Sequence, residues 1–134
     1  MTYAVNTDTP CWQPTATLET LRARAAMLAS IRAFFAARDV LEVETPVLGR
    51  FGVTDVHLSA VPVQIAAAGE VADSTGWLQT SPEYHMKRLL AAGTGSIYQV
   101  FRAFRNGERG RRHNPEFSLL EWYRTGFDLP ALMD

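Results

Sequence analysis

The chain has very little cysteine, almost no net charge and no long apolar run. Its single cysteine, Cys11, cannot form a disulfide within the chain, and the N-terminal residues lack the basic start and apolar core of a signal peptide. No apolar stretch approaches the roughly 20 residues that a membrane-spanning helix needs. These absences predict a cytoplasmic protein without a membrane segment.

The balance of charges limits the kinds of partner. The formal net charge is -1, from 13 Lys+Arg and 14 Asp+Glu, which argues against a protein that coats nucleic acids or membranes by charge alone. A length of 134 residues, 47% hydrophobic and 20% charged, is typical of about one globular domain. Any contact with a polyanion must therefore be local.

Two common kinds of catalytic site find no support. His57, His85 and His113 are scattered and lack nearby cysteines or paired carboxylates, so no metal site is predicted among the side chains. No serine lies in a G-x-S-x-G elbow, so a serine nucleophile is not predicted either.

Residues 101–124 are locally basic, because arginines outnumber glutamates there. Before and after a loop, alternating residues predict two antiparallel strands. Asn106, Gly107 and Gly110 supply the loop chemistry, and Pro115 marks the return to the second strand. A hairpin with an arginine-rich loop of this kind can hold a nucleotide.

The rest of the chain predicts alternating helices and strands. Ser81 is a suitable helix cap, Pro82 suits the first helical position, and Asp128 is a plausible cap for a later helix. Because the chain ends at Asp134, soon after that helix begins, it is predicted to be truncated. The predicted elements are an arm at 1–16, an amphipathic helix at 17–37, a strand at 40–47 that breaks or bulges at Pro46, a loop at 49–55, a strand at 57–65, a turn region at 66–75, a strand at 77–80, and a helix from Ser81 to near Gly93.

The candidate site residues each have two interpretations. Arg105, where the first hairpin strand meets the loop, could grip a phosphate or carboxylate bidentately, or be a solvated arginine. Phe117 could stack on a base or belong to the core. Glu121 and Tyr123 share a strand face and could take an ammonium group, or form ordinary cross-strand pairs. Glu83 could be a ligand or a residue that favours the helix dipole.

Taken in order, these segments resemble the catalytic domain of class II aminoacyl-tRNA synthetases, in the lysyl branch. ARDVLEVETPVL is similar to the first class II motif, and FRNGERGRRHNPEF is similar to the second. LQTSPEYHMKRLLAAG, joined to HNPEFSLLEWYR, resembles the lysyl-tRNA synthetase paralogues that lysylate elongation factor P. The resemblance covers residues 12–134. It implies an α+β fold, an antiparallel sheet flanked by helices and incomplete in this chain, with 17–134 as the N-terminal part of the catalytic domain.

The resemblance also implies an activity. Lysine or β-lysine would be activated by ATP as an aminoacyl-adenylate and transferred to a lysine side chain of elongation factor P, with Mg²⁺ as the accompanying ion. A homodimer would form through the helix and the Pro46 strand of the first motif. tRNA is not expected as a partner, because residues 1–16 are too few to build an anticodon-binding barrel.

The resemblance assigns roles to the candidate residues. Arg105 would contact the ATP α-phosphate and the substrate carboxylate as the catalytic residue, and Phe117 would stack against adenine. No nucleophilic side chain is implied. The remaining ATP-binding residues would be Asn106, Gly107, His113 and Asn114; Ser81, Pro82 and Glu83 would shape the amino-acid pocket, with Glu83 on the α-ammonium, and Glu121 and Tyr123 would approach the ε-ammonium.

The chain departs from the family pattern in two places. Gly107 stands where the family has an acidic residue, with Glu108 next to it, and nothing corresponds to the third class II motif. We therefore expect the isolated chain to be inactive and to expose unpaired strand edges. Two alternatives remain open: a catalytic fragment of a lysyl-tRNA synthetase, and a non-catalytic binding module derived from a synthetase.

Overall fold

The structure is a computed structural model of the chain, and it describes residues 12–66, 68–69, 71 and 74–133. Most of the predicted arm at 1–16, including Cys11, lies outside the described residues. The chain divides into two compact units, Met1–Phe34 and Phe35–Asp134. Among the described residues, no helix has the length and apolar character to cross a membrane.

Helix α1 (Leu18–Ala36) confirms the predicted first helix. Thr17 caps it, because its hydroxyl accepts a hydrogen bond from the Thr20 N–H at 3.1 Å. Along the expected apolar face, Leu21 is 48% exposed, Leu28 and Ile31 are half-buried, and Phe35 is buried.

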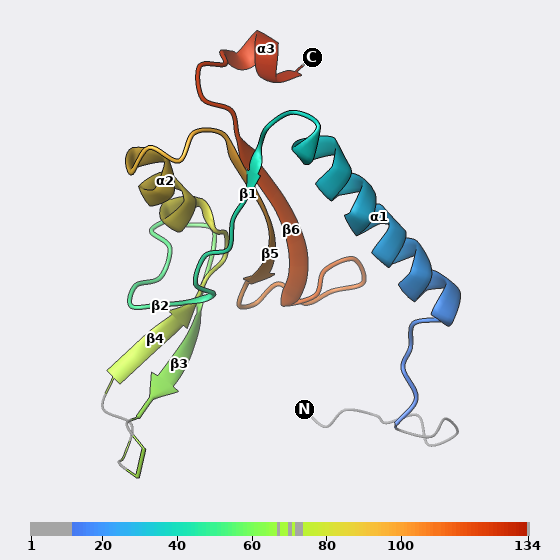
Figure 1. Cartoon of the computed structure of the whole chain (residues 1–134). Helices are drawn as coiled ribbons and strands as arrows, with labels where there is room; N and C mark the ends of the chain where they lie inside the picture. The colour runs from blue at the N-terminus through green and yellow to red at the C-terminus, as the bar shows by residue number, and fades with distance from the viewer. Residues whose placement is uncertain (1–11, 67, 70, 72–73, 134) are drawn as a thin grey trace. The chain divides into compact units, whose positions relative to one another are not determined.

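The second unit is built on the sheet of β1 (Leu41–Glu42), β5 (Ile97–Phe104) and β6 (Glu116–Tyr123), in the order β1-β5-β6 (Figure 1). The predicted hairpin is confirmed: β5 and β6 pair antiparallel along their whole lengths, from Ile97 opposite Tyr123 to Phe104 opposite Glu116. β1 pairs parallel to β5, so the sheet is mixed. These elements give the α+β architecture expected from the sequence.

The break expected at Pro46 is confirmed, but the predicted strand at 40–47 is limited to Leu41–Glu42, because the chain changes sheets beyond it. The Val43 N–H still donates to the Tyr98 carbonyl at 2.9 Å, but Pro46 has no N–H for the ladder. Beyond Pro46, the chain forms β2 (Leu48–Gly49), which pairs antiparallel with β4 (Ser74–Leu78) in a second sheet.

The second sheet has the order β2-β4-β3, with β3 at Val61–Ile65. The predicted strand at 57–65 therefore starts four residues too early, and the predicted turn at 66–75 extends too far. The pairing of Ser74 with Ile65 and of Leu78 with Val61 determines the observed bounds. Local alternation could not reveal this register, because it depends on the partner strand.

Helix α2 (Glu83–Ala91) begins one residue later than expected, with Pro82 as the residue before it. The Ser81 hydroxyl accepts the Glu83 N–H at 3.1 Å, so Ser81 contributes to the helix start. The helix stops as predicted, because Gly93 adopts a φ of 88° that favours glycine. Helix α3 (Leu129–Met133) is capped by Asp128, whose Oδ1 accepts the Ala131 N–H at 3.0 Å.

The core of the second unit is centred on β5. Ile97, Phe101 and Ala103 are almost fully buried, as is Met86 of α2. The Phe35 ring stacks on Tyr98 with centroids 4.1 Å apart. These contacts fix the strand that leads into the arginine-rich loop.

We predict that Phe101→Ala lowers the free energy of unfolding by about 3 to 5 kcal/mol, because it removes a buried ring and leaves a cavity. The matched control, Phe51→Ala, removes a ring that is 75% exposed and should change stability by less than about 0.5 kcal/mol. Urea unfolding of the two variants measures the difference. Equal effects would contradict the assignment of Phe101 to the core.

Candidate active site

The loop between β5 and β6 borders an open cavity of about 570 Å³. Five of the candidate ATP-binding residues line it: Arg105, Gly107, His113, Asn114 and Phe117. Glu108, Arg109, Gly110 and Arg112 complete the lining. Asn106 is not part of it. Its backbone N–H donates to the Ser59 carbonyl at 2.7 Å, which anchors the start of the loop to another segment.

Arg105 is held in place by three neighbours, and its side chain is only 25% exposed. Its Nε donates to the Thr80 carbonyl at 3.4 Å, and its Nη1 lies 3.8 Å from a Glu108 carboxylate oxygen. The guanidinium carbon lies 5.0 Å from the centroid of the Phe117 ring. Of the two interpretations of Arg105, the solvated arginine does not fit these contacts.

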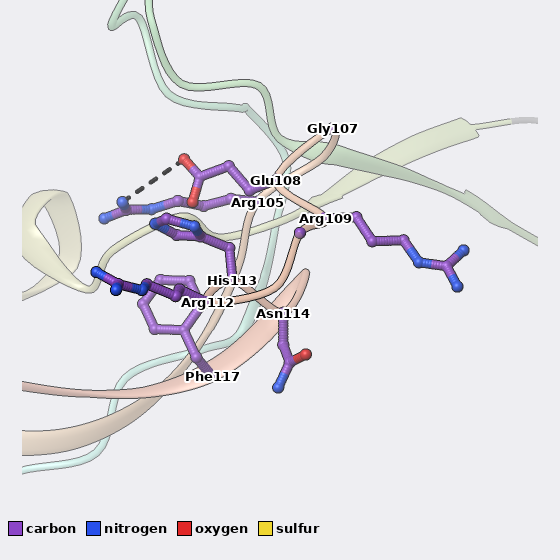
Figure 2. A pocket seen from close by; sticks show the side chains of 9 residues that line it. Arg105, Gly107, Glu108, Arg109, Arg112, His113, Asn114 and Phe117 are labelled. Carbon is purple, nitrogen blue, oxygen red and sulfur yellow. Dashed lines mark ion pairs between the residues drawn. The ribbon is translucent and has the colours of Figure 1, made fainter.

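The loop geometry separates the arginines from one another. Gly110 and His113 exchange backbone hydrogen bonds of 3.1 and 3.3 Å, which close a tight turn. Figure 2 shows Arg112 and His113 on the same side as Arg105 and Phe117, whereas the Arg109 and Asn114 side chains point away from this group. The cavity therefore has a basic and aromatic side that suits a phosphate with an attached base.

The backbone conformation explains why a glycine stands at position 107. Its φ is 80°, a left-handed value that strains other residues. The neighbouring Glu108 carries the carboxylate, and that carboxylate faces Arg105.

A second group of candidates surrounds the Glu121 carboxylate. The Ser81 hydroxyl donates to Oε2 at 2.8 Å, and the Tyr123 hydroxyl donates to Oε1 at 2.7 Å. Both carboxylate oxygens are thus fixed in direction, and all three residues are half-buried. Burial raises the pKa of Tyr123, and the hydrogen bond and negative charge of Glu121 raise it further.

Glu83 and Pro82 lie beside this group at the start of α2. The Glu83 carboxylate is paired with the Lys87 ammonium at 2.5 Å, one helical turn further on. Pro82 is fully buried and fixes the backbone that leads into the helix. Lys87 was not among the sequence candidates, although its spacing of four residues from Glu83 is a signal for such a pair.

Hydrogen bonds of the segment from Gln79 to Ser81 join the two groups into one site. The Phe104 N–H donates to the Gln79 carbonyl at 3.0 Å, and the next residue, Arg105, donates to the Thr80 carbonyl. The next residue along, Ser81, donates to Glu121. The segment from Gln79 to Ser81 therefore connects the nucleotide-sized cavity to the carboxylate. No sequence signal identifies the Thr80 carbonyl, because a backbone group can belong to any residue.

The family of tRNA synthetases class II (D, K and N) matches residues 12–134. The chain belongs to this family. The match includes both candidate groups, the β5–β6 hairpin and the segment that precedes α2.

Curated relatives narrow the comparison. The chain is 60% identical over 123 residues to an elongation factor P--(R)-beta-lysine ligase of Actinobacillus succinogenes. It is 57% identical to the protein of that name from Pasteurella multocida, and 56% identical to that from Vibrio campbellii. Each match covers 92% of this chain and 38% of the relative. The chain thus spans well under half the length of these relatives.

We predict that Glu121→Gln lowers the pKa of Tyr123, because the amide carries no charge to oppose the phenolate. The pKa should stay above its ordinary value of about 10, because burial is the largest cause of the rise. A raised phenol pKa stabilises the fold below about pH 10, and this contribution is lost as the pH rises further. Titration of the Tyr123 ring carbon by NMR measures the change. An unchanged pKa would show that the Tyr123–Glu121 hydrogen bond does not form in solution.

Proposed function

We propose that this chain is part of an ATP-dependent ligase that activates lysine or β-lysine as an aminoacyl-adenylate and transfers it to a lysine side chain of elongation factor P. The observation that carries the proposal is Arg105, held between a nucleotide-sized cavity and the segment that fixes Glu121. Family membership and the names of the relatives support the ligase class. The (R)-β-lysine in those names favours that isomer as the substrate.

The proposed reaction needs charge neutralisation more than a nucleophilic side chain. A substrate carboxylate oxygen attacks the α-phosphorus of ATP, and pyrophosphate leaves. The acceptor amine then attacks the carbonyl carbon and forms an amide, and AMP leaves with the electrons of the broken bond. Two anions meet in the first step, so a fixed guanidinium beside both lowers the barrier. Arg105, which lines the cavity, would take that role.

On the nucleotide side, Phe117 would stack against adenine. In the free chain the Arg105 guanidinium lies over this ring, so ATP binding would draw the guanidinium towards the α-phosphate. His113, Asn114 and the Gly107 backbone would line the nucleotide. Asn106 would act through its backbone bond to Ser59, which holds the loop in place.

On the amino-acid side, Glu121 and Tyr123 would receive the ε-ammonium of the substrate. The Ser81 hydroxyl would stay bonded to Oε2 of Glu121. Glu83 would receive the ammonium nearer the carboxyl group. That ammonium would have to displace Lys87, which occupies Glu83 in the free chain. Replacement of one ammonium by another of the same charge leaves the electrostatics of Glu83 nearly unchanged.

Mg²⁺ would accompany ATP mainly through phosphate oxygens and water. No group of three metal-ligating side chains exists among the described residues, and Glu108 is the carboxylate present in the cavity lining. The ion would supply positive charge to the phosphates. Glu108, already paired with Arg105, is the side chain from this part of the chain that could add a ligand.

We further propose a cytoplasmic homodimer in which α1 and the Pro46 segment meet a second copy. The support is a set of exposed apolar side chains on α1, of which Leu18, Leu21 and Met27 are 71%, 48% and 57% exposed. Surfaces of this kind favour burial against a partner.

We predict that Arg105→Ala lowers ATP–pyrophosphate exchange by about 10² to 10³ in the complete enzyme, because one preorganised positive donor is lost at the reacting phosphate. The matched control is Arg111→Ala, in the same loop but outside the cavity lining. That variant should retain an exchange rate close to wild type. A rate for Arg105→Ala within tenfold of wild type would refute the catalytic assignment.

The choice of acceptor tests the rest of the proposal. The complete enzyme is supplied with ATP and radiolabelled (R)-β-lysine or lysine, together with elongation factor P or tRNA. Label should appear in elongation factor P and not in tRNA. Label in tRNA would favour a lysyl-tRNA synthetase, and no exchange or transfer at all would favour a binding module.

A further inference from the structure

A second cavity, of about 490 Å³, lies next to α2 and the loop that follows β2. The side chains that matter for its chemistry are Arg50, Gln79, His85 and Arg88. None of the residues that line the hairpin-loop cavity belongs to it. The two cavities are therefore distinct sites.

The lining of the second cavity contains basic groups and no carboxylate. Neither Arg50 nor Arg88 forms an ion pair with any residue in the part of the chain that the structure describes. Two guanidinium groups on one cavity repel each other, and an anion between them would remove that repulsion. Arginine is also the side chain best suited to hold an oxyanion through several N–H groups.

His85 provides an independent observation. Its Nδ1 is buried and has no hydrogen-bond partner among the described residues. Buried polar atoms usually have a partner, so an unpartnered nitrogen is an unusual feature in a residue that also lines a cavity. Burial, and then the charge of Arg88, lower the pKa of His85. The neutral form of the imidazole is thus favoured when the cavity is empty.

The wall of the cavity is fixed before any ligand arrives. Gln79 is 6% exposed, and its Nε2 donates to the carbonyls of Phe51 and Trp77, both at 3.0 Å. Gly49 permits this close approach, because a Cβ there would lie 2.6 Å from the same nitrogen. The loop that carries Arg50 is thereby tied to β4, so the backbone of this wall needs little ordering on binding.

We propose that this second cavity binds a phosphate group through Arg50, Arg88 and His85, independently of the nucleotide cavity. The bound anion would favour the imidazolium form of His85 and so oppose the effect of Arg88. The other titratable side chain in the lining is Tyr84, on α2. Because no acidic side chain lines the cavity, an added anion is what can raise the pKa of His85.

The three histidines make the test specific. His85 reports on the second cavity, His113 lines the nucleotide cavity, and His57 lines neither. Imidazole resonances are followed by NMR during a titration with inorganic phosphate, with chloride at equal ionic strength as the baseline. Phosphate should shift the His85 resonances and raise the pKa of His85, with little change at His57.

Two variants assign the binding groups. Arg50→Gln and Arg88→Gln should each weaken the phosphate response of His85 by about tenfold, as expected for the loss of a charge-assisted hydrogen bond. Arg111→Gln removes the same charge outside both cavities and should leave this response unchanged. Arg105→Ala should alter the His113 response alone, which keeps this test separate from that of the proposed function.

Three results would overturn the proposal. His85 could remain unmoved while His113 responds, which would confine phosphate to the nucleotide cavity. Arg111→Gln could weaken the His85 response as much as Arg88→Gln, which would reduce it to a general effect of charge. Acetate could act as strongly as phosphate, which would rule out selectivity for a phosphate group.

Discussion

The candidate site depends on one short run of contacts between the segment from Gln79 to Ser81 and the β5–β6 hairpin. Two of these contacts use backbone carbonyls, which accept from Phe104 and Arg105, and the third is the hydrogen bond from Ser81 to Glu121. The segment belongs to the connection between the second sheet and α2, whereas the hairpin belongs to the first sheet. Without these contacts, nothing would hold the Arg105 guanidinium and the Glu121 carboxylate in one site.

The charged candidates are already paired within the chain. Arg105 faces Glu108, and Glu83 holds Lys87. The Glu83–Lys87 pair is exposed, and such pairs contribute little to stability, so a ligand can replace Lys87 at small cost. Glu121 differs, because it is half-buried and held by two hydroxyl groups, which carry no charge that a ligand must displace. Its negative charge thus remains available to an ammonium group.

Local patterns in the sequence predicted those elements whose boundaries depend on neighbouring residues alone. The hairpin follows from alternation around a glycine-containing loop, and the helix ends follow from Gly93 and Asp128. The strand at 40–47 was predicted too long, although its break at Pro46 was foreseen, because the change of partner strand there depends on residues far along the chain. For the candidate site, motif resemblance singled out Arg105, Phe117 and Glu121, of which the first two line the hairpin-loop cavity and the third bonds to Ser81. It could not find the Thr80 carbonyl, or that Asn106 bonds to Ser59, since neither depends on a recognisable side-chain pattern.

The central claim is that one end of the site binds the nucleotide and the other binds the amino acid. Measurement of apparent affinities for lysine and for ATP in the complete enzyme, with Glu121→Gln beside Glu116→Gln, tests it most directly. Both glutamates lie on β6, and Glu116 pairs with Arg102 away from Ser81. Glu121→Gln should weaken lysine binding by at least about tenfold and leave ATP binding unchanged, because an amide cannot match a carboxylate that faces an ammonium. Equal losses for both ligands, or the same loss in Glu116→Gln, would contradict this division of the site.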